Sequence, residues 1–129
     1  MLVLLRVAFW AALLFSFVMA VLPHPPDLPG DPSDKILHVL AFSVLAALAP
    51  LAYPAARPAR IGLLLSAFGA LIEIVQTIPS LHRDAELIDW VADTAALAAV
   101  LSLATLLRAQ LTRRAAAQAK SRADSASQA

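Results

Sequence analysis

Four long apolar segments, separated by short polar stretches, dominate the chain. They run over residues 1–22, 35–53, 61–78 and 87–107. A helix of roughly 20 mainly apolar residues spans the ~30 Å hydrocarbon core of a membrane, and each segment is close to that length. Strands are not indicated, because no alternation of apolar and polar residues persists. The pattern predicts an all-α polytopic membrane protein whose four transmembrane helices form a compact bundle.

Proline-rich stretches separate the apolar segments. Proline lacks an amide donor and disfavours helix in the residue before it, so these stretches are expected to end helices. Their prolines are Pro23, Pro25, Pro26, Pro29, Pro32, Pro54, Pro58 and Pro79. We therefore predict one unit of four transmembrane helices over residues 1–108, followed by a basic, Ala- and Ser-rich tail over residues 109–129. The tail is expected to start as a frayed helical extension and then become disordered.

The composition supports a membrane protein and excludes other classes. Hydrophobic residues make up 60% of the 129 residues and charged residues 15%, whereas soluble domains average ~45–50% and ~25%. A disordered chain would show the opposite bias. The net charge of +1 and the aromatic content of 6% argue against a nucleic-acid partner. Because the chain has no cysteine, disulfides, thiol catalysis and cysteine metal sites are excluded, and we predict no cofactor.

Lysine and arginine are distributed unevenly over the connections, and cytoplasmic loops are enriched in both. If both termini and the second connection are cytoplasmic, that side holds Arg6, Arg57, Arg60, Arg108, Arg113, Arg114, Lys120 and Arg122. Lys35 and Arg83 then remain on the outer side. We therefore expect a multi-pass protein of the cytoplasmic (inner) membrane with both termini cytoplasmic. The first segment is also compatible with a cleaved signal peptide.

Polar residues inside the apolar segments gather in one half of the predicted bundle. Small and polar residues share one face of the third segment, namely Gly62, Ser66, Gly69, Glu73 and Gln76. Asp89, Asp93, Ala96 and Val100 share a face of the fourth. Ionisable groups within a membrane span are costly, so each calls for a partner or a function. These residues lie at similar depths along the predicted helices, so we expect them to form one polar site in the outer leaflet. The site consists of Lys35, His38, Glu73, Gln76, Asp89 and Asp93, with Arg83 in the joining loop.

These residues resemble the VanZ-like family of small bacterial integral membrane proteins, whose namesake is associated with teicoplanin resistance. The matching stretches are residues 34–38 (Asp-Lys-Ile-Leu-His), Phe42, 72–76 (Ile-Glu-Ile-Val-Gln), 83–85 (Arg-Asp-Ala) and 89–94 (Asp-Trp-Val-Ala-Asp-Thr). The chain departs from the family pattern at Asp93, where Asn is frequent, and at Ala96, where Gly is frequent. The resemblance implies the four-span fold and an envelope-related membrane function, without settling the chemistry.

A binding or catalytic pocket is the first hypothesis for the polar site. Lys35 and Arg83 are donors suited to an anion such as the headgroup of a membrane lipid, a lipid-linked envelope precursor or a glycopeptide-related ligand. His38 and Glu73 are candidates for acid and base in transfer or hydrolysis at that headgroup, with Asp89 as a third catalytic candidate. Further binding candidates are Asp34, Gln76 and Asp93.

Two other interpretations stay open. In one, the same groups form a structural network that locks the helices together without a ligand, which makes the protein a non-catalytic membrane scaffold. In the other, the protein is a metal-dependent membrane enzyme with a divalent cation held by His38, Glu73, Asp89 and Asp93; His24 and His82 are weaker candidates. Desolvation and repulsion between carboxylates predict that Glu73 or Asp93 is protonated near neutral pH or paired with a basic neighbour.

Overall fold

The computed structural model describes residues 1–23, 33–83 and 85–127. The described helices are α1 (Leu2–Val21), α2 (Asp34–Ala52), α3 (Pro58–Gln76), the short 3-10 helix η1 (Pro79–Leu81) and α4 (Leu87–Ser127). This part of the chain contains no strand, so the all-helical prediction is confirmed. Several residues considered above lie outside the described residues: His24, Pro25, Pro26, Pro29, Pro32 and Asp84.

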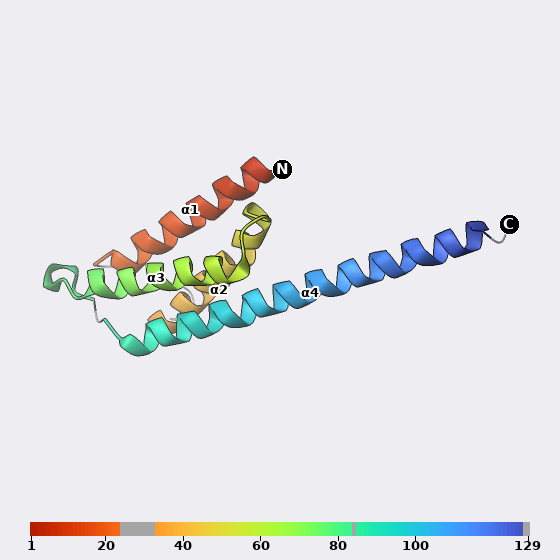
Figure 1. Ribbon diagram of the computed structural model, residues 1–129. Helices are drawn as coiled ribbons and strands as arrows, with labels where there is room; N and C mark the ends of the chain where they lie inside the picture. Colours follow the sequence, from red (N-terminus) through yellow and green to blue (C-terminus); the bar gives the residue numbers. More distant parts are fainter. Residues whose placement is uncertain (24–32, 84, 128–129) are drawn as a thin grey trace.

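The helices run up and down in sequence order (Figure 1). The N-terminus and the α2–α3 connection lie at one end of the bundle, and η1 lies at the other (Figure 1). α2 and α3 each contact the other three long helices, and α2, which makes the most extensive contacts, is the central helix. This arrangement brings the start of α2, the end of α3 and the start of α4 to the same end.

Helix α2 supplies more of the buried core than any other described helix. Phe42 and Leu45 of α2 are almost completely buried, together with Ile72 of α3 and Leu97 of α4. The outward faces are apolar too, as shown by the exposed Leu63. Each of α1 to α4 is long and apolar enough to cross a membrane. An apolar exterior around a packed interior is what a lipid environment favours, because apolar side chains gain nothing there by turning inward.

The small-residue face of α3 allows its neighbours to approach closely. A Cβ atom at Gly69 would lie 3.2 Å from Phe42 Cζ and 3.4 Å from Trp90 Cδ1. One turn away, the Ser66 hydroxyl lies 2.9 Å from the Thr94 hydroxyl, which joins α3 to α4. The periodicity of the third segment thus correctly identified its packing face. On α4, Leu97 continues the face of Asp89 and Asp93 and is more deeply buried than Ala96.

Helix α4 is longer than the sequence pattern predicts. We expected the apolar span to end near residue 107 and the tail to start as a frayed helical extension, and the helix continues to Ser127. Residues 106–121 of this extension are exposed, and they project beyond the bundle (Figure 1). The tail is rich in alanine and arginine, which are strong helix formers, so local propensity favours helix along this exposed extension.

Two arginines bind the end of α2 that lies opposite η1. Arg6 Nε donates to the Ala52 carbonyl at 3.3 Å, and Arg108 Nη2 donates to the Pro50 carbonyl at 2.6 Å. The last carbonyls of a helix have no partner within it and carry partial negative charge, so a guanidinium is a suitable cap. These contacts tie α1 and α4 to the central helix at this end.

Candidate functional site

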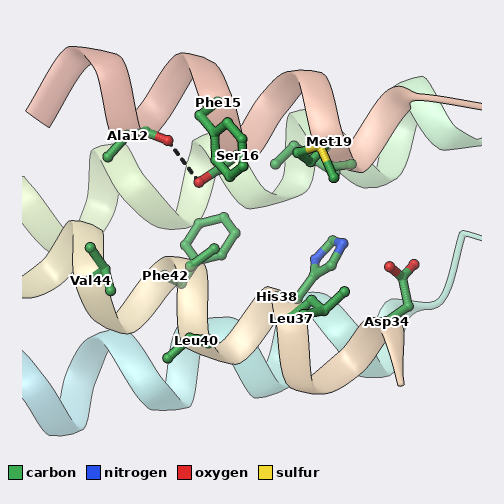
Figure 2. Close-up of a pocket in the computed structure, with 13 residues that line it drawn as sticks. Ala12, Phe15, Ser16, Met19, Asp34, Leu37, His38, Leu40, Phe42 and Val44 are labelled. Atoms are coloured by element: carbon green, nitrogen blue, oxygen red, sulfur yellow. Dashed lines mark hydrogen bonds between the residues drawn. The ribbon is translucent and has the colours of Figure 1, made fainter. Parts of the chain in front are cut away.

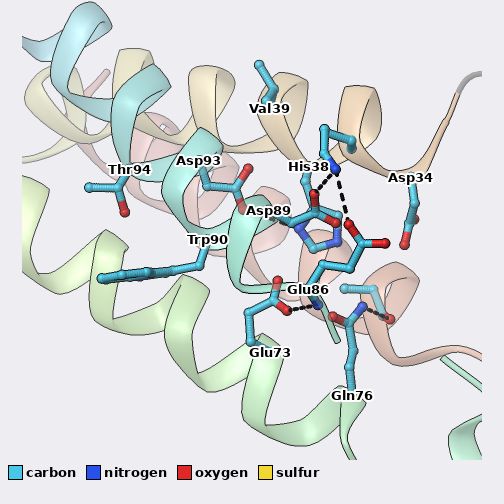
Figure 3. A network of polar contacts seen from close by, with 12 residues as sticks. Asp34, His38, Val39, Glu73, Gln76, Glu86, Asp89, Trp90, Asp93 and Thr94 are labelled. Carbon is cyan, nitrogen blue, oxygen red and sulfur yellow. Dashed lines mark hydrogen bonds and ion pairs between the residues drawn. The ribbon is translucent and has the colours of Figure 1, made fainter. Parts of the chain in front are cut away.

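The opposite end of the bundle holds a cluster of ionisable side chains from α2, α3 and α4 (Figure 3). Lys35, in the first turn of α2, reaches the segment that opens α4. Its Nζ lies 2.6 Å from Asp89 Oδ1 and 3.3 Å from Glu86 Oε2. The Lys35 side chain is 43% exposed, whereas that of Asp89 is 9% exposed. The ion pair therefore lies at the rim of the bundle and joins its central helix to α4.

A second ion pair joins the loop before α4 to the start of α2. Arg83 Nη2 donates to Asp34 Oδ2. The Arg83 side chain is 11% exposed although it belongs to a loop. Asp34 occupies the first turn of α2, where a carboxylate is also favoured by the helix dipole. Arg83 thus packs the loop against the bundle, with its charge already balanced.

His38 and Asp93 form the deepest polar contact in the cluster. His38 Nδ1 lies 3.2 Å from Asp93 Oδ2, and the two residues are 7% and 1% exposed. Asp93 is therefore paired with a basic neighbour, one of the two outcomes predicted for it. Among the described residues, His38 Nε2 and Asp93 Oδ1 are buried without a hydrogen-bond partner. A buried polar atom without a partner is costly, so these two atoms mark where the network is incomplete.

Glu73 contacts the backbone of the loop. Its Oε2 accepts a hydrogen bond from the Glu86 backbone amide at 2.9 Å. Glu86 directly precedes α4, and its carbonyl accepts from the Asp89 amide at 2.8 Å. Glu73 therefore holds the chain at the point where α4 begins, which in turn positions Asp89.

Gln76 has a structural contact that the sequence did not suggest. Its Nε2 donates to the Ala20 carbonyl at 3.0 Å, and the residue is 2% exposed. Ala20 lies in the last turn of α1, where a helix leaves its carbonyls without internal partners. In this arrangement the Gln76 amide group joins α3 to α1, and its nitrogen donates to backbone instead of to a ligand.

Sequence reasoning missed two contributors to this end of the bundle. Glu86 was not among the predicted site residues, although it contacts Lys35 and positions the loop through Glu73. Its place three residues before Asp89, at a helix start, is a pattern that favours carboxylates. Trp90 donates from Nε1 to the Ser66 carbonyl at 3.0 Å and so fastens α4 to α3. No local pattern marks that contact.

The charges of the cluster are unequal. Carboxylates outnumber permanent cations, with Asp34, Glu73, Glu86, Asp89 and Asp93 set against Lys35 and Arg83. Each of the two cations already contacts at least one carboxylate. An anionic ligand must therefore compete with these carboxylates for Lys35 or Arg83. His38 differs, because its Nε2 is held in place by the contact at Nδ1 and has no partner among the described residues to displace.

The described residues contain no group of three or more His, Asp or Glu side chains that could hold a metal ion. His82 lies in the exposed loop after η1 with a left-handed φ of 49°, and its Nδ1 is 3.1 Å from the Ser80 carbonyl. It is not among the contacts of the cluster described above.

Comparisons with models of known protein families, with functionally characterised proteins and with solved structures give no match for this chain. The resemblance to the VanZ-like family therefore stays a prediction based on the residues quoted above.

Proposed function

We propose that this chain is a multi-pass inner-membrane protein of the VanZ-like type that binds the headgroup of an envelope lipid. Both termini lie in the cytoplasm in this proposal, and the ionisable cluster faces the outer leaflet. The observation that carries the binding function is the buried His38 Nε2, which has no hydrogen-bond partner among the described residues. A group that only stabilised the fold would be expected to have its polar atoms satisfied.

The membrane orientation is supported by the positions of the basic residues. Arg6 and Arg108 bind the end of α2 opposite the cluster, and Arg57 and Arg60 flank the start of α3 at the same end. The positive-inside tendency places such an end in the cytoplasm. Because the chain lacks cysteine, single cysteines at exposed positions can report the orientation directly.

The orientation is tested with Ser80→Cys and Ala55→Cys, which lie in exposed connections at opposite ends of the bundle. A membrane-impermeant maleimide should label position 80 in intact cells and position 55 only after the membrane is permeabilised. The reverse labelling pattern would contradict the proposed orientation.

Headgroup binding assigns distinct roles to the cluster. Lys35 and Arg83 supply positive charge for a phosphate, each exchanging a carboxylate partner for the ligand. His38, oriented by Asp93, is the group placed to exchange a hydrogen with the headgroup. Glu73 positions the loop and supports the site indirectly.

The structural-network function is the second candidate, and one observation favours it. Lys35 and Arg83 both have carboxylate partners, so the cluster can join α2 to α4 without any ligand. In that case, removing either cation should weaken the fold and leave lipid binding unchanged.

Lipid retention separates the two functions. Protein reconstituted with phosphatidylethanolamine and phosphatidylglycerol is extracted into mild detergent, and bound lipid is counted by native mass spectrometry. We expect one retained phosphatidylglycerol, and at least about tenfold weaker retention in Lys35→Gln or Arg83→Gln, because hydrogen bonds to charged groups are worth that factor or more. The control Arg60→Gln removes an exposed arginine at the other end and should retain the lipid. Equal retention in all variants would support the network instead.

A further inference from the structure

A groove between α1 and α2 opens beside the polar cluster (Figure 2). Its volume is about 430 Å³, within the ~300–1,000 Å³ usual for small-molecule sites. Phe15 and Met19 of α1 form one wall, and Leu40 and Val44 of α2 form the other, with Ile72 of α3 also in the lining. The surface that it offers is almost entirely hydrocarbon.

The groove is accessible from the side of the bundle. Phe15 is 66% exposed and Leu40 is 59% exposed, so neither wall is closed over by another described helix. Ser16 also lines the groove, but its hydroxyl donates to the Ala12 carbonyl at 2.8 Å. Both α1 and α2 are long and apolar enough to cross a membrane. In the proposed orientation, the groove therefore faces the acyl chains of the bilayer.

One end of the groove is polar. The His38 ring lies between α1 and α2, and the Asp34 carboxylate lies at the same end (Figure 2). The Nδ1 edge of the ring faces Asp93, which leaves Nε2 as the atom without a partner among the described residues. Asp34 also contacts Arg83, so the groove leads directly into the ionisable cluster.

This combination defines a particular kind of ligand. Along most of the groove, the described side chains offer only dispersion contacts, and the polar groups lie at one end. Such a lining suits a hydrocarbon chain. A hydroxyl both donates and accepts hydrogen bonds, so it matches Nε2 whether that nitrogen carries a hydrogen or not. The adjoining Lys35 and Arg83 suit a phosphate.

We propose that the α1–α2 groove holds one hydrocarbon chain of an anionic phospholipid, and that a free hydroxyl of its headgroup hydrogen-bonds to His38 Nε2. The inference rests on the proposed headgroup-binding function, because it assigns the chain and one headgroup contact of the same lipid. A helix from a second copy of this chain fits less well, since the imidazole is only 7% exposed and requires a small group that can reach it.

The experiment compares two lipids with identical chains and identical charge. Phosphatidylglycerol carries headgroup hydroxyls and phosphatidylpropanol carries none, and both are titrated into the full-length detergent-solubilised protein and followed by native mass spectrometry. The wild type should prefer phosphatidylglycerol by about three- to tenfold, the factor that one hydrogen bond supplies. His38→Asn should abolish this preference, because the asparagine amide can still donate to Asp93 but has no counterpart of Nε2.

The chain-binding part is tested by filling the groove. Val44→Trp places an indole in the groove, and the matched control Leu64→Trp places one on the exposed surface of α3. Val44→Trp should weaken the binding of both lipids by at least about tenfold, because the loss of some ten carbon–carbon contacts accounts for that factor. The control should bind as the wild type does. Leu40→Trp is a second filling variant if Val44→Trp does not fold.

The outcomes separate this inference from the function on which it rests. Unchanged lipid affinity in the groove-filling variants overturns the chain site, and a lipid preference that survives in His38→Asn overturns the hydroxyl contact. A protein dimer that disappears in Val44→Trp would also overturn the inference, because the groove would then hold a second copy. Failure of Lys35→Gln and Arg83→Gln to weaken binding contradicts the proposed headgroup-binding function, whereas the groove-filling variants test the chain site separately.

Discussion

The His38–Asp93 contact should contribute more to stability than any neutral hydrogen bond between the helices. The two side chains meet at 3.2 Å and are both less than a tenth exposed. Asp93→Ala removes the acceptor at Nδ1 and leaves the imidazole without a partner there. Asp93→Asn keeps an acceptor oxygen in place and should therefore be milder. The Ser66–Thr94 hydroxyl pair, at 2.9 Å between α3 and α4, is a neutral control in the same bundle.

The expected magnitudes follow from the burial of the pair. Hydrogen bonds to charged groups contribute about 1.5–3 kcal/mol, and we expect the upper limit, about 3 kcal/mol, for Asp93→Ala, because the buried imidazole loses its carboxylate partner. Hydrogen bonds between membrane helices average about 0.6 kcal/mol in double-mutant cycles, with a maximum near 1.7. We therefore expect a coupling energy of about 1.5 kcal/mol for His38 and Asp93, against about 0.6 kcal/mol for Ser66 and Thr94.

The assay is reversible unfolding in mixed micelles with increasing sodium dodecyl sulfate, followed by far-ultraviolet circular dichroism. Two cycles are measured, one with alanine at positions 38 and 93, the other with Ser66→Ala and Thr94→Val. In each cycle, the losses in the free energy of unfolding of the two single variants are subtracted from the loss in the double variant. A His38–Asp93 coupling no larger than the Ser66–Thr94 coupling would refute the reasoning, because burial and charge would then add nothing to the contact.

Three further predictions concern packing, capping and the tail. Gly69→Leu should lower the free energy of unfolding by about 1–3 kcal/mol, the usual cost of overpacking, because even a Cβ there meets Phe42 at 3.2 Å. Arg108→Met should cost about 1 kcal/mol, the worth of one hydrogen bond, because the Pro50 carbonyl loses its donor. Deleting residues 115–129 should change the free energy of unfolding by no more than about 0.5 kcal/mol, which is the usual effect of a substitution at the protein surface. All three are measured by the same unfolding titration.

Matched controls sharpen these predictions. Gly62→Ala is the control for position 69, because its Cβ would meet only the mobile end of Leu101 at 3.3 Å. Arg113→Met removes an exposed arginine beyond the bundle and should not alter unfolding. If Gly69→Leu unfolds like the wild type, the close approach of α2 and α4 to this face of α3 is wrong. A large loss on deletion of the tail would show that the extension stabilises the bundle.

The local pattern of the sequence was sufficient to predict the helices and several of their buried faces. Twenty-residue apolar segments bounded by proline predict spanning helices without knowledge of their neighbours. The spacing of Gly69, Glu73 and Gln76 likewise predicts a shared face, because helical periodicity is a local property. Both features appear in the structure. The tail was expected to start as a helical extension, and α4 continues through it to Ser127.

The partners of the polar residues were decided by tertiary structure. Lys35 and Asp89 are separated by more than fifty residues in the chain, as are Gln76 and Ala20, and each pair meets only because of how the helices pack. The rotation and relative height of neighbouring helices depend on interlocking side chains such as Phe42 against Gly69. No periodicity within one helix encodes them. The sequence by itself therefore determined most of the residues at the polar end, whereas packing determined their partners and left His38 Nε2 buried without one among the described residues.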